Sequence, residues 1–389
     1  MKSLLVLRRT LASGLFVLLA AQALAAPPEP TERERAMLQE LQQPNEVFAA
    51  KLKGPQEVVA GRALHPKIQW ALENARTAAA QNRQDQLEKW KDAAYRAQSR
   101  AAVDRTWNYR TKVTAEMERV EDREIDGPGS KLKLRIYTPR TTEKGPLPIL
   151  VYFHGGGWLF GSVEAADRAT RLIANEARAI VVSASYRLSP EAKFPAPQDD
   201  AMQVYRWVRA HATKLGGKPD LVAIGGDSAG GQMALVTSLR LIKAGEKPPA
   251  YQLLYYPAAD MGTEYKSYEQ FGSGYGLDRN LAELVFVSFF ADQKDRLHPD
   301  ASPLRAASFR GLPPTLIATA GFDILHDVGE QLAQRMQQDR VAVLWKDYTS
   351  LNHGFMQHSG TIDDAERACV ETAQIFGDVV RGRVPKKFN

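Results

Sequence analysis

The string GDSAG, residues 226–230, sets a serine between two glycines that lie two positions before and two positions after it. An apolar run precedes the string, and a helical pattern follows it to about residue 243. A serine at a sharp strand-to-helix turn has a strained backbone, and side chains at the two flanking positions would collide. We therefore expect Ser228 to project as a nucleophile at the carboxyl edge of a sheet, above the amino terminus of a helix.

A serine hydroxyl becomes a good nucleophile only when a base takes its proton, and a third group must orient that base. For a serine in this type of turn, the order along the chain is nucleophile, acid, histidine. The apolar run PTLIATAGFD ends at Asp323, and LNHGF places His353 in a loop before the last predicted helix. The order and positions predict a triad of Ser228, Asp323 and His353.

Other acids and histidines follow Ser228 in the chain. Asp347, after the next predicted strand, is the alternative acid. Asp327 is expected in the first turn of a helix, where the helix dipole alone favours an acidic residue. His326 and His358 are the alternative bases, and we expect each of them to be a surface residue.

The string YFHGGGWLFG, residues 152–161, has three consecutive glycines at the end of an apolar run. Attack on an ester carbonyl puts negative charge on its oxygen, and fixed backbone N–H groups stabilise that charge. Glycines leave such amides uncovered, although they lose more conformational entropy on folding than other residues. We expect this loop to turn its amides toward Ser228, and Ala229, next to the nucleophile, to add another.

The elements that must position these residues alternate along most of the chain. Residues 31–110 have the apolar spacing of two or three amphipathic helices, and residues 113–139 that of an antiparallel hairpin. From residue 147 onward, short apolar runs alternate with helical segments, which predicts a mostly parallel sheet with helices on both faces. Residues 26–112 and an irregular stretch at about 261–297 do not fit this alternation. We expect them to form a helical cap, with residues 113–389 as the catalytic domain.

Six strings in one order resemble the hormone-sensitive-lipase-like branch of the α/β-hydrolases, to which many bacterial carboxylesterases belong. They are HGGGW, YRLSPEAKFPAPQDD, GDSAGG, SPL, GFDILHD and HGF, and the resemblance covers about residues 113–380. It implies an α/β-hydrolase fold in which Ser228 is the nucleophile, Asp323 the acid and His353 the base. The family usually has proline after the acid, where this chain has Ile324.

The resemblance also assigns the glycine loop. Gly156 and Gly157, with Ala229, are similar to the oxyanion donors of the family, and Gly155 remains a neighbouring candidate. His154 looks like the histidine that holds this loop, not like a second base.

The implied reaction is acyl transfer through an acyl-serine intermediate, with short- to medium-chain esters of small molecules as substrates. It needs no metal or cofactor, and no run of His, Cys, Asp or Glu has convincing ligand spacing. The same triad would also serve an amidase, a lactonase or a sugar-ester deacetylase. A non-catalytic receptor is a further alternative, because the plant gibberellin receptors resemble this family but lack the catalytic histidine.

The first 25 residues carry three cations, an apolar run and a small-residue pattern that is typical of a secretory signal peptide cut before Ala26 or Pro27. A retained membrane anchor is the weaker alternative, since the run falls short of a full span. We therefore expect a periplasmic or secreted protein, by a general or a twin-arginine export route. Removal of this segment lowers the formal net charge from +6 to +3, so no nucleic-acid partner is indicated.

The chain has one cysteine, Cys369, in a helical pattern near the carboxyl end. It excludes an intramolecular disulfide, so an exported form must be stable through its core alone. We expect Cys369 to be a small buried helix residue and not a nucleophile.

Overall fold

The computed structural model of the chain describes residues 29–78 and 83–383. The predicted signal peptide, residues 1–25, lies outside the described residues. Within these two ranges, no helix combines the length and the apolarity that crossing a membrane requires.

An eight-stranded sheet forms the centre of the molecule, in the order β10-β9-β8-β7-β5-β6-β4-β3. β3 and β4 form the predicted antiparallel hairpin, β4 pairs antiparallel with β6, and the other neighbours are parallel. The mostly parallel sheet predicted from the sequence is therefore confirmed. Its strands are β3 (Arg119–Asp126), β4 (Lys131–Thr138), β5 (Leu147–Phe153), β6 (Ile180–Ala184), β7 (Gly217–Asp227), β8 (Gln252–Tyr255), β9 (Thr315–Phe322) and β10 (Val343–Asn352).

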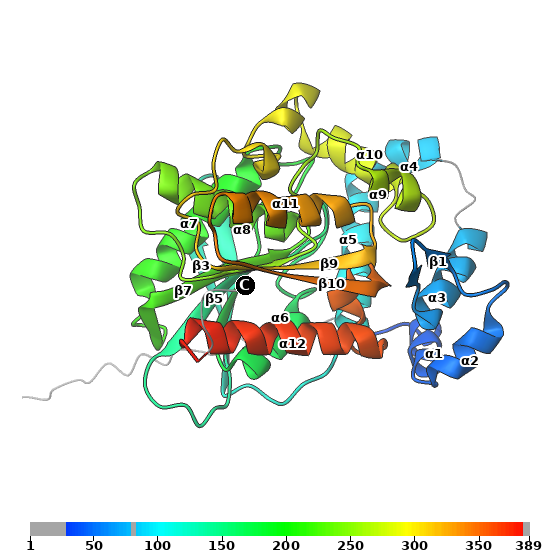
Figure 1. Cartoon of the computed structure of the whole chain (residues 1–389), viewed down its shortest axis with the longest axis horizontal. Helices are drawn as coiled ribbons and strands as arrows, with labels where there is room; N and C mark the ends of the chain where they lie inside the picture. Colours follow the sequence, from blue (N-terminus) through cyan, green and yellow to red (C-terminus); the bar gives the residue numbers. More distant parts are fainter. Residues whose placement is uncertain (1–28, 79–82, 384–389) are drawn as a thin grey trace, which may run out of the picture.

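Helices cover both faces of this sheet, as the alternating pattern predicts. Every residue of β5, β6, β8 and β9 is buried, because apolar side chains leave these strands in both directions and need a covering layer. One layer lies above the sheet in Figure 1 and one below it. The first consists of α7 (Ala196–His211), α8 (Ala229–Lys243) and α11 (His326–Gln338), and the second of α6 (Asp167–Ala177) and α12 (Asp363–Val380).

In its described part, residues 29–78 and 83–110, the amino-terminal region holds five helices and a short hairpin, not two or three helices. Short elements such as α2 and α4 have too few apolar residues for periodicity to separate them. The hairpin lies against the sheet edge, where the His65 N–H donates to the Ser350 carbonyl of β10 at 2.9 Å. The elements are α1 (Glu32–Leu41), α2 (Asn45–Lys51), β1 (Val58–Val59), β2 (Arg62–Ala63), α3 (Pro66–Ala78), α4 (Arg83–Trp90) and α5 (Ala93–Arg110).

The expectation of an irregular stretch at 261–297 is wrong in part, because the segment contains α9 (Lys266–Phe271), α10 (Arg279–Phe289) and the 3-10 helix η1 (Gln293–Leu297). α10 begins where the Asp278 carboxylate accepts the Leu281 N–H at 2.9 Å, which satisfies a free donor of its first turn. Ala282, Leu284 and Val285 of α10 are buried. Two further 3-10 turns are η2 (Pro303–Arg305) and η3 (Phe355–His358).

Candidate active site

Ser228 lies in the one-residue turn between the end of β7 and the start of α8. Its backbone has φ +55° and ψ −117°, a strained conformation for a residue with a side chain. Backbone hydrogen bonds hold the turn: the Ser228 N–H donates to the Tyr255 carbonyl at 2.9 Å, and the Ala258 N–H donates to the Ser228 carbonyl at 3.1 Å. The structure thus places Ser228 in the sharp strand-to-helix turn that its glycine spacing predicts.

The two flanking glycines allow the turn to lie directly against β5. A Cβ atom on Gly230 would overlap the carbonyl oxygen of Phe153, the last residue of β5. A Cβ on Gly226 would overlap the same oxygen and approach the Gly230 carbonyl carbon at 2.5 Å. Close packing of α8 on β5, at the point where the glycine loop begins, therefore depends on bare backbone at Gly230.

Asp323 and His353 join Ser228 in one hydrogen-bonded chain. The His353 Nε2 atom lies 3.0 Å from the Ser228 Oγ, and the His353 Nδ1 atom lies 2.6 Å from the Asp323 Oδ2. Asp323 follows β9 and is 1% exposed, and its second oxygen accepts the Leu325 N–H at 2.9 Å. A buried carboxylate on one ring nitrogen leaves the other nitrogen free to accept the serine proton.

The glycine loop follows β5 and has an unusual backbone. Gly156 has φ +107°, Gly157 φ +60° and Trp158 φ +59°, and the N–H groups of Leu159 and Phe160 both donate to the Gly156 carbonyl at 3.0 Å. The N–H groups of Gly156 and Gly157 donate to no other residue that the structure describes. Two backbone donors are therefore left for a ligand.

The backbone N–H groups of Ala229 and Gly155 differ in whether a ligand could use them. Ala229 is the first residue of α8, so its N–H has no partner inside the helix. Ala229, Gly157 and Ser228 all line one pocket, whereas Gly156 is not in its lining. The Gly155 N–H instead donates to the Asp227 carboxylate at 2.9 Å, which leaves Gly155 the least suited of the four as a ligand donor.

Asp227 connects the serine turn to two other parts of the site, which the sequence analysis missed. Its Oδ1 accepts the Tyr152 hydroxyl at 2.6 Å and the Gly155 N–H at 2.9 Å, and its Oδ2 accepts the Gln357 amide at 3.0 Å. Asp227 is 2% exposed, so these bonds replace its contacts with water. The only signal in the sequence was an acid beside the nucleophile, where the glycine spacing leaves the residue type open.

His154 lies at the base of the glycine loop and is buried. Its Nδ1 donates to the Gly155 carbonyl at 2.8 Å, and its ring stacks on Tyr186 with the centroids 4.4 Å apart. The Tyr186 hydroxyl in turn donates to the His154 carbonyl at 2.9 Å. Burial lowers the pKa of His154, which favours a neutral ring. The geometry fits a residue that holds the loop.

The expectation that His326 is a surface residue is wrong. It is 2% exposed, with Nδ1 3.1 Å from an Asp327 oxygen and Nε2 3.2 Å from an Asp347 oxygen. Burial alone would lower the pKa of His326, but the adjacent carboxylates of Asp327 and Asp347 raise it to about 9. Asp347 lies within β10 and not after the strand, and its oxygens face His326, Thr319 and Arg62. Asp347, the alternative acid, and Asp327 thus both contact His326 instead of His353.

Two further residues complete the comparison with the sequence. His358, also expected at the surface, is half-buried in η3, where burial and the charge of Arg110 lower its pKa to about 3. Cys369 is buried in α12, as expected, and burial raises the pKa of its thiol. A thiol with a raised pKa is a poor nucleophile.

A pocket borders Ser228 and encloses about 670 Å³, part of it open to solvent. Apolar side chains from the glycine loop, α10 and the start of α11 form much of its wall, and polar groups lie on the segment after β8. The apolar members are Trp158, Ala258, Met261, Leu277, Ala282, Val285, Phe286, Ile324, Leu325 and Val328. Five of these ten residues come from the 261–297 segment, which the sequence assigns to the cap. Such a wall suits an uncharged, apolar ligand.

Two groups of side chains in the described ranges have ligand atoms close enough to share a cation: His65 with Asp363 and Asp364, and His326 with Asp327 and Glu330. In each group the histidine already contacts a carboxylate directly, at 2.9 Å for His65 and 3.1 Å for His326. Neither group lines the Ser228 pocket. At Ser228 itself, the Asp323, His353 and Ser228 side chains are arranged for proton transfer.

Comparisons with known proteins agree with this arrangement. A family model described as alpha/beta hydrolase fold matches residues 150–357. The carboxylic ester hydrolase LipN of Mycobacterium tuberculosis is 39% identical over 243 residues, which are 61% of this chain and 64% of LipN. An ethyl acetate hydrolase of Pseudomonas putida is 32% identical over 244 residues, 62% of this chain and 77% of that protein. The crystal structure of LAE6, an alpha/beta hydrolase enzyme from the metagenome of Lake Arreo, has a TM-score of 0.74 and 35% identity, and the match covers 79% of this chain and 95% of LAE6.

Proposed function

Because the chain belongs to the α/β-hydrolase fold family, in its hormone-sensitive-lipase-like branch, we propose that it is a serine carboxylesterase acting on small-molecule esters. The observation that carries the proposal is the hydrogen-bonded chain from Asp323 through His353 to Ser228, at 2.6 and 3.0 Å. Ser228, at the end of these hydrogen bonds, borders an apolar pocket, next to backbone N–H groups that donate to no other described residue. A nucleophile, an oriented base and donors for a developing oxyanion are the parts that acyl transfer requires.

The reaction follows from the positions of these atoms. His353 Nε2 accepts the proton as the Ser228 oxygen attacks the ester carbonyl carbon, and the N–H groups of Gly156, Gly157 and Ala229 stabilise the oxyanion. The tetrahedral intermediate expels the alcohol, which takes the proton from His353, and leaves an acyl-serine. A water molecule then gives a proton to His353 and attacks the acyl carbon, and the carboxylic acid leaves as Ser228 regains its hydrogen.

The proposed substrates are esters with acyl chains from acetyl to hexanoyl. An apolar wall and a bounded pocket support a short or medium chain, and one relative is an ethyl acetate hydrolase. Rates for p-nitrophenyl esters of increasing acyl length test this proposal, and we expect a maximum at six carbons or fewer. A maximum at the palmitoyl ester would contradict it. Amide, lactone and acetylated-sugar substrates, compared in the same assay, separate the esterase from the other uses of the triad.

Replacement of Ser228 by alanine tests the catalytic proposal itself. We expect kcat for p-nitrophenyl acetate to fall by roughly four to six orders of magnitude with the fold intact, because no other group takes over the acyl transfer. Ser238→Ala is a matched control on α8, the helix that follows Ser228, since that buried hydroxyl donates only to the Ala234 carbonyl at 3.1 Å. Undiminished turnover in Ser228→Ala would refute both the esterase and the related acyl-transfer proposals.

The proposal includes export and a two-part cap. The charged and apolar pattern of residues 1–25 supports export to the periplasm or the medium, and residues 26–112 with 261–297 are proposed to cover the catalytic domain. The mass of the mature protein purified from a producing cell tests the export proposal. We expect the chain to begin at Ala26 or Pro27, and an intact Met1 in the exported fraction would contradict cleavage.

A further inference from the structure

One face of α5 contacts the chain segment that follows the three glycines. Arg100, Asp104 and Asn108 are four residues apart, so they lie in a row along the helix. The Arg100 Nε donates to the Leu159 carbonyl at 2.9 Å, the Asp104 carboxylate accepts the Ser162 hydroxyl at 2.8 Å, and the Asn108 amide donates to the Glu164 carbonyl at 3.1 Å. Three successive side chains thus hold three successive points of the same segment.

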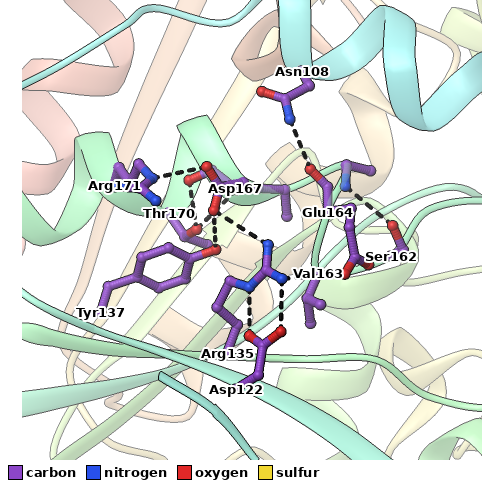
Figure 2. A network of polar contacts seen from close by, with 12 residues as sticks. Asn108, Asp122, Arg135, Tyr137, Ser162, Val163, Glu164, Asp167, Thr170 and Arg171 are labelled. Atoms are coloured by element: carbon purple, nitrogen blue, oxygen red, sulfur yellow. Dashed lines mark hydrogen bonds and ion pairs between the residues drawn. The ribbon is translucent and has the colours of Figure 1, made fainter. Parts of the chain in front are cut away.

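The far side of this segment is also fixed, as Figure 2 shows, with Asn108 above and Arg135 below Glu164. The Arg135 guanidinium, which is 3% exposed, donates to the Glu164 carboxylate at 3.2 Å and to Asp122 at 2.6 Å. Lys133 contacts the same Glu164 carboxylate. The segment therefore lies between the sheet on one side and α5 on the other, and α5 supplies one of the two sides.

The segment is mechanically joined to the glycines. The N–H groups of Leu159 and Phe160 donate to the Gly156 carbonyl, so residues 156–160 form one hydrogen-bonded turn. The Arg100 guanidinium donates to the Leu159 carbonyl of this turn and also to the Ser189 carbonyl at 2.8 Å. The Ser189 N–H in turn donates to the Trp158 carbonyl at 2.8 Å. A shift of α5 would therefore shift the turn that carries the proposed oxyanion donors.

We propose that Asp104 and Asn108 of α5, with Arg100, are positioning residues that set the geometry of the oxyanion loop. α5 lies outside residues 150–357, the part that the family model matches. The contacts that hold the loop on this side therefore come from the amino-terminal region of this chain. The proposal rests on the proposed function, because it concerns the donors for that reaction. Backbone donors stabilise an oxyanion only within a narrow range of distance, and a misplacement of about 1 Å costs on the order of a hundredfold in rate.

The test uses the full mature chain with Asp104→Leu and Asn108→Leu, singly and together. These changes keep side-chain size close to that of the original residues and remove the polar contacts to Ser162 and Glu164. We expect the double variant to lose about tenfold or more in kcat for p-nitrophenyl acetate, with KM within about twofold of wild type. A trifluoromethyl ketone, which mimics the tetrahedral state, should bind more weakly by a similar factor. Asp104→Asn retains an oxygen that accepts the Ser162 hydrogen and should recover most of the loss seen in Asp104→Leu.

Arg105→Met is the matched control on the same helix. Arg105 donates to Glu34 of α1 at 3.0 Å and does not touch the glycine loop, so the variant should keep kcat while it weakens the α1–α5 contact. The proposal is overturned when the Asp104→Leu and Asn108→Leu variants, single and double, all keep kcat within twofold of wild type. It is also overturned when Arg105→Met loses as much kcat as they do, or when these variants raise KM and leave kcat unchanged. The single variants preserve the test when the double variant does not fold. Turnover that survives Ser228→Ala refutes the proposed function. If turnover depends on Ser228 but the Asp104 and Asn108 variants are as active as wild type, only the positioning role of α5 is refuted.

Discussion

The serine turn and the glycine loop are two strained segments that meet at one reaction centre, and they are held by different means. The turn at Ser228 is fixed by backbone hydrogen bonds to Tyr255 and Ala258. The loop at residues 155–164 is held largely by side chains, from Asp227 at one end to Asp104 and Asn108 at the other. The turn depends on backbone contacts with the sheet and with the segment after β8, whereas the loop also depends on the side chains of α5, an element far away in sequence.

This difference indicates where the site tolerates change. Strain at a turn that is built into the sheet persists as long as the sheet folds. Strain in a loop held by separate side chains can relax when one of them is lost, because each contributes a limited amount of free energy. We therefore expect changes around the loop to alter the rate without unfolding the protein, and changes at the triad to abolish it.

The largest expected effect comes from the triad. Asp323→Asn should lower kcat roughly ten-thousandfold, because an amide at this position favours the wrong tautomer of His353. The buried Asp323 Oδ2 lies 2.6 Å from the His353 Nδ1, so little else can orient the ring. Steady-state kinetics with p-nitrophenyl acetate measure the loss. Asp347→Asn, the alternative acid of the sequence analysis, serves as the comparison and should keep turnover near that of wild type.

Gly156→Val tests the loop directly. Gly156 has φ +107°, and a Cβ atom there would overlap the Phe160 carbonyl oxygen, so the turn must deform. We expect kcat to fall roughly a hundred- to a thousandfold, the cost of losing one oxyanion donor, while the circular dichroism spectrum stays native. Gly145→Val also has a positive φ, of +88°, but open space around its Cβ position. Equal losses in both variants would show that backbone strain, not donor geometry, causes the effect.

His326 supports the strand end next to Asp323, and its loss should appear in stability. Its pKa of about 9 lies above the unfolded value of 6.5, so its stabilising effect is complete below pH 6.5 and is lost as the pH rises through about 9. His326→Gln leaves two partly buried carboxylates, those of Asp327 and Asp347, without their cation, which should cost about 3 kcal/mol near pH 6.5. Denaturant unfolding across pH 6 to 9.5 should show the gap from wild type closing. A constant gap would exclude the charged imidazole as its source.

Asp227→Asn weakens a side-chain contact that joins the turn to the loop. A neutral amide oxygen accepts the Gly155 N–H less strongly than a carboxylate does, so we expect roughly a tenfold fall in kcat. Tyr152→Phe removes the 2.6 Å bond to the same oxygen without touching the loop, and its effect on kcat should be smaller. The comparison is contradicted when Tyr152→Phe has the larger effect on kcat.

Asp104 should give the smallest effect, with a pH dependence of the same sign as that of His326 but in a more acidic range. Burial raises the pKa of Asp104 to about 6 from an unfolded value of 3.8, despite the hydrogen bond from Ser162. The folded state therefore binds this proton more tightly, and stability falls as the pH rises from about 4 to 6. The melting temperature of Asp104→Asn relative to wild type should rise across that interval. Asp92→Asn, an exposed cap on the same helix, should show no such rise.

The parts predicted from the sequence are those with a local signature. The strand alternation gave the sheet and its helical layers, and the glycine spacing placed Ser228 at the end of β7. Asp323 and His353 were found because each follows a recognisable apolar run. The structure brings these three side chains together at the predicted ends of their strands.

The parts that were missed depend on residues distant in sequence. His326 reads as a surface residue because its partner Asp347 lies 21 positions later on another strand. The role of Asp227 depends on Gly155 and Gln357, which approach it only after the sheet has formed. α10 was missed because its apolar residues face the glycine loop as well as the core. The row of polar residues on α5 likewise has no meaning until Ser162 and Glu164 lie beside it.

The contact between Gly230 and the Phe153 carbonyl has a consequence for engineering this pocket. Because α8 rests on β5 without an intervening side chain, the separation between Ser228 and the glycine loop is set by an absent methyl group. A library that randomises the pocket lining can include Phe286 of α10, which meets the cavity and is only partly buried, whereas Val285 is buried next to Gly157 and should be kept. If the library also varies Gly230, most clones with another residue there should be inactive. Gly230 therefore fixes the spacing on which the whole catalytic centre depends.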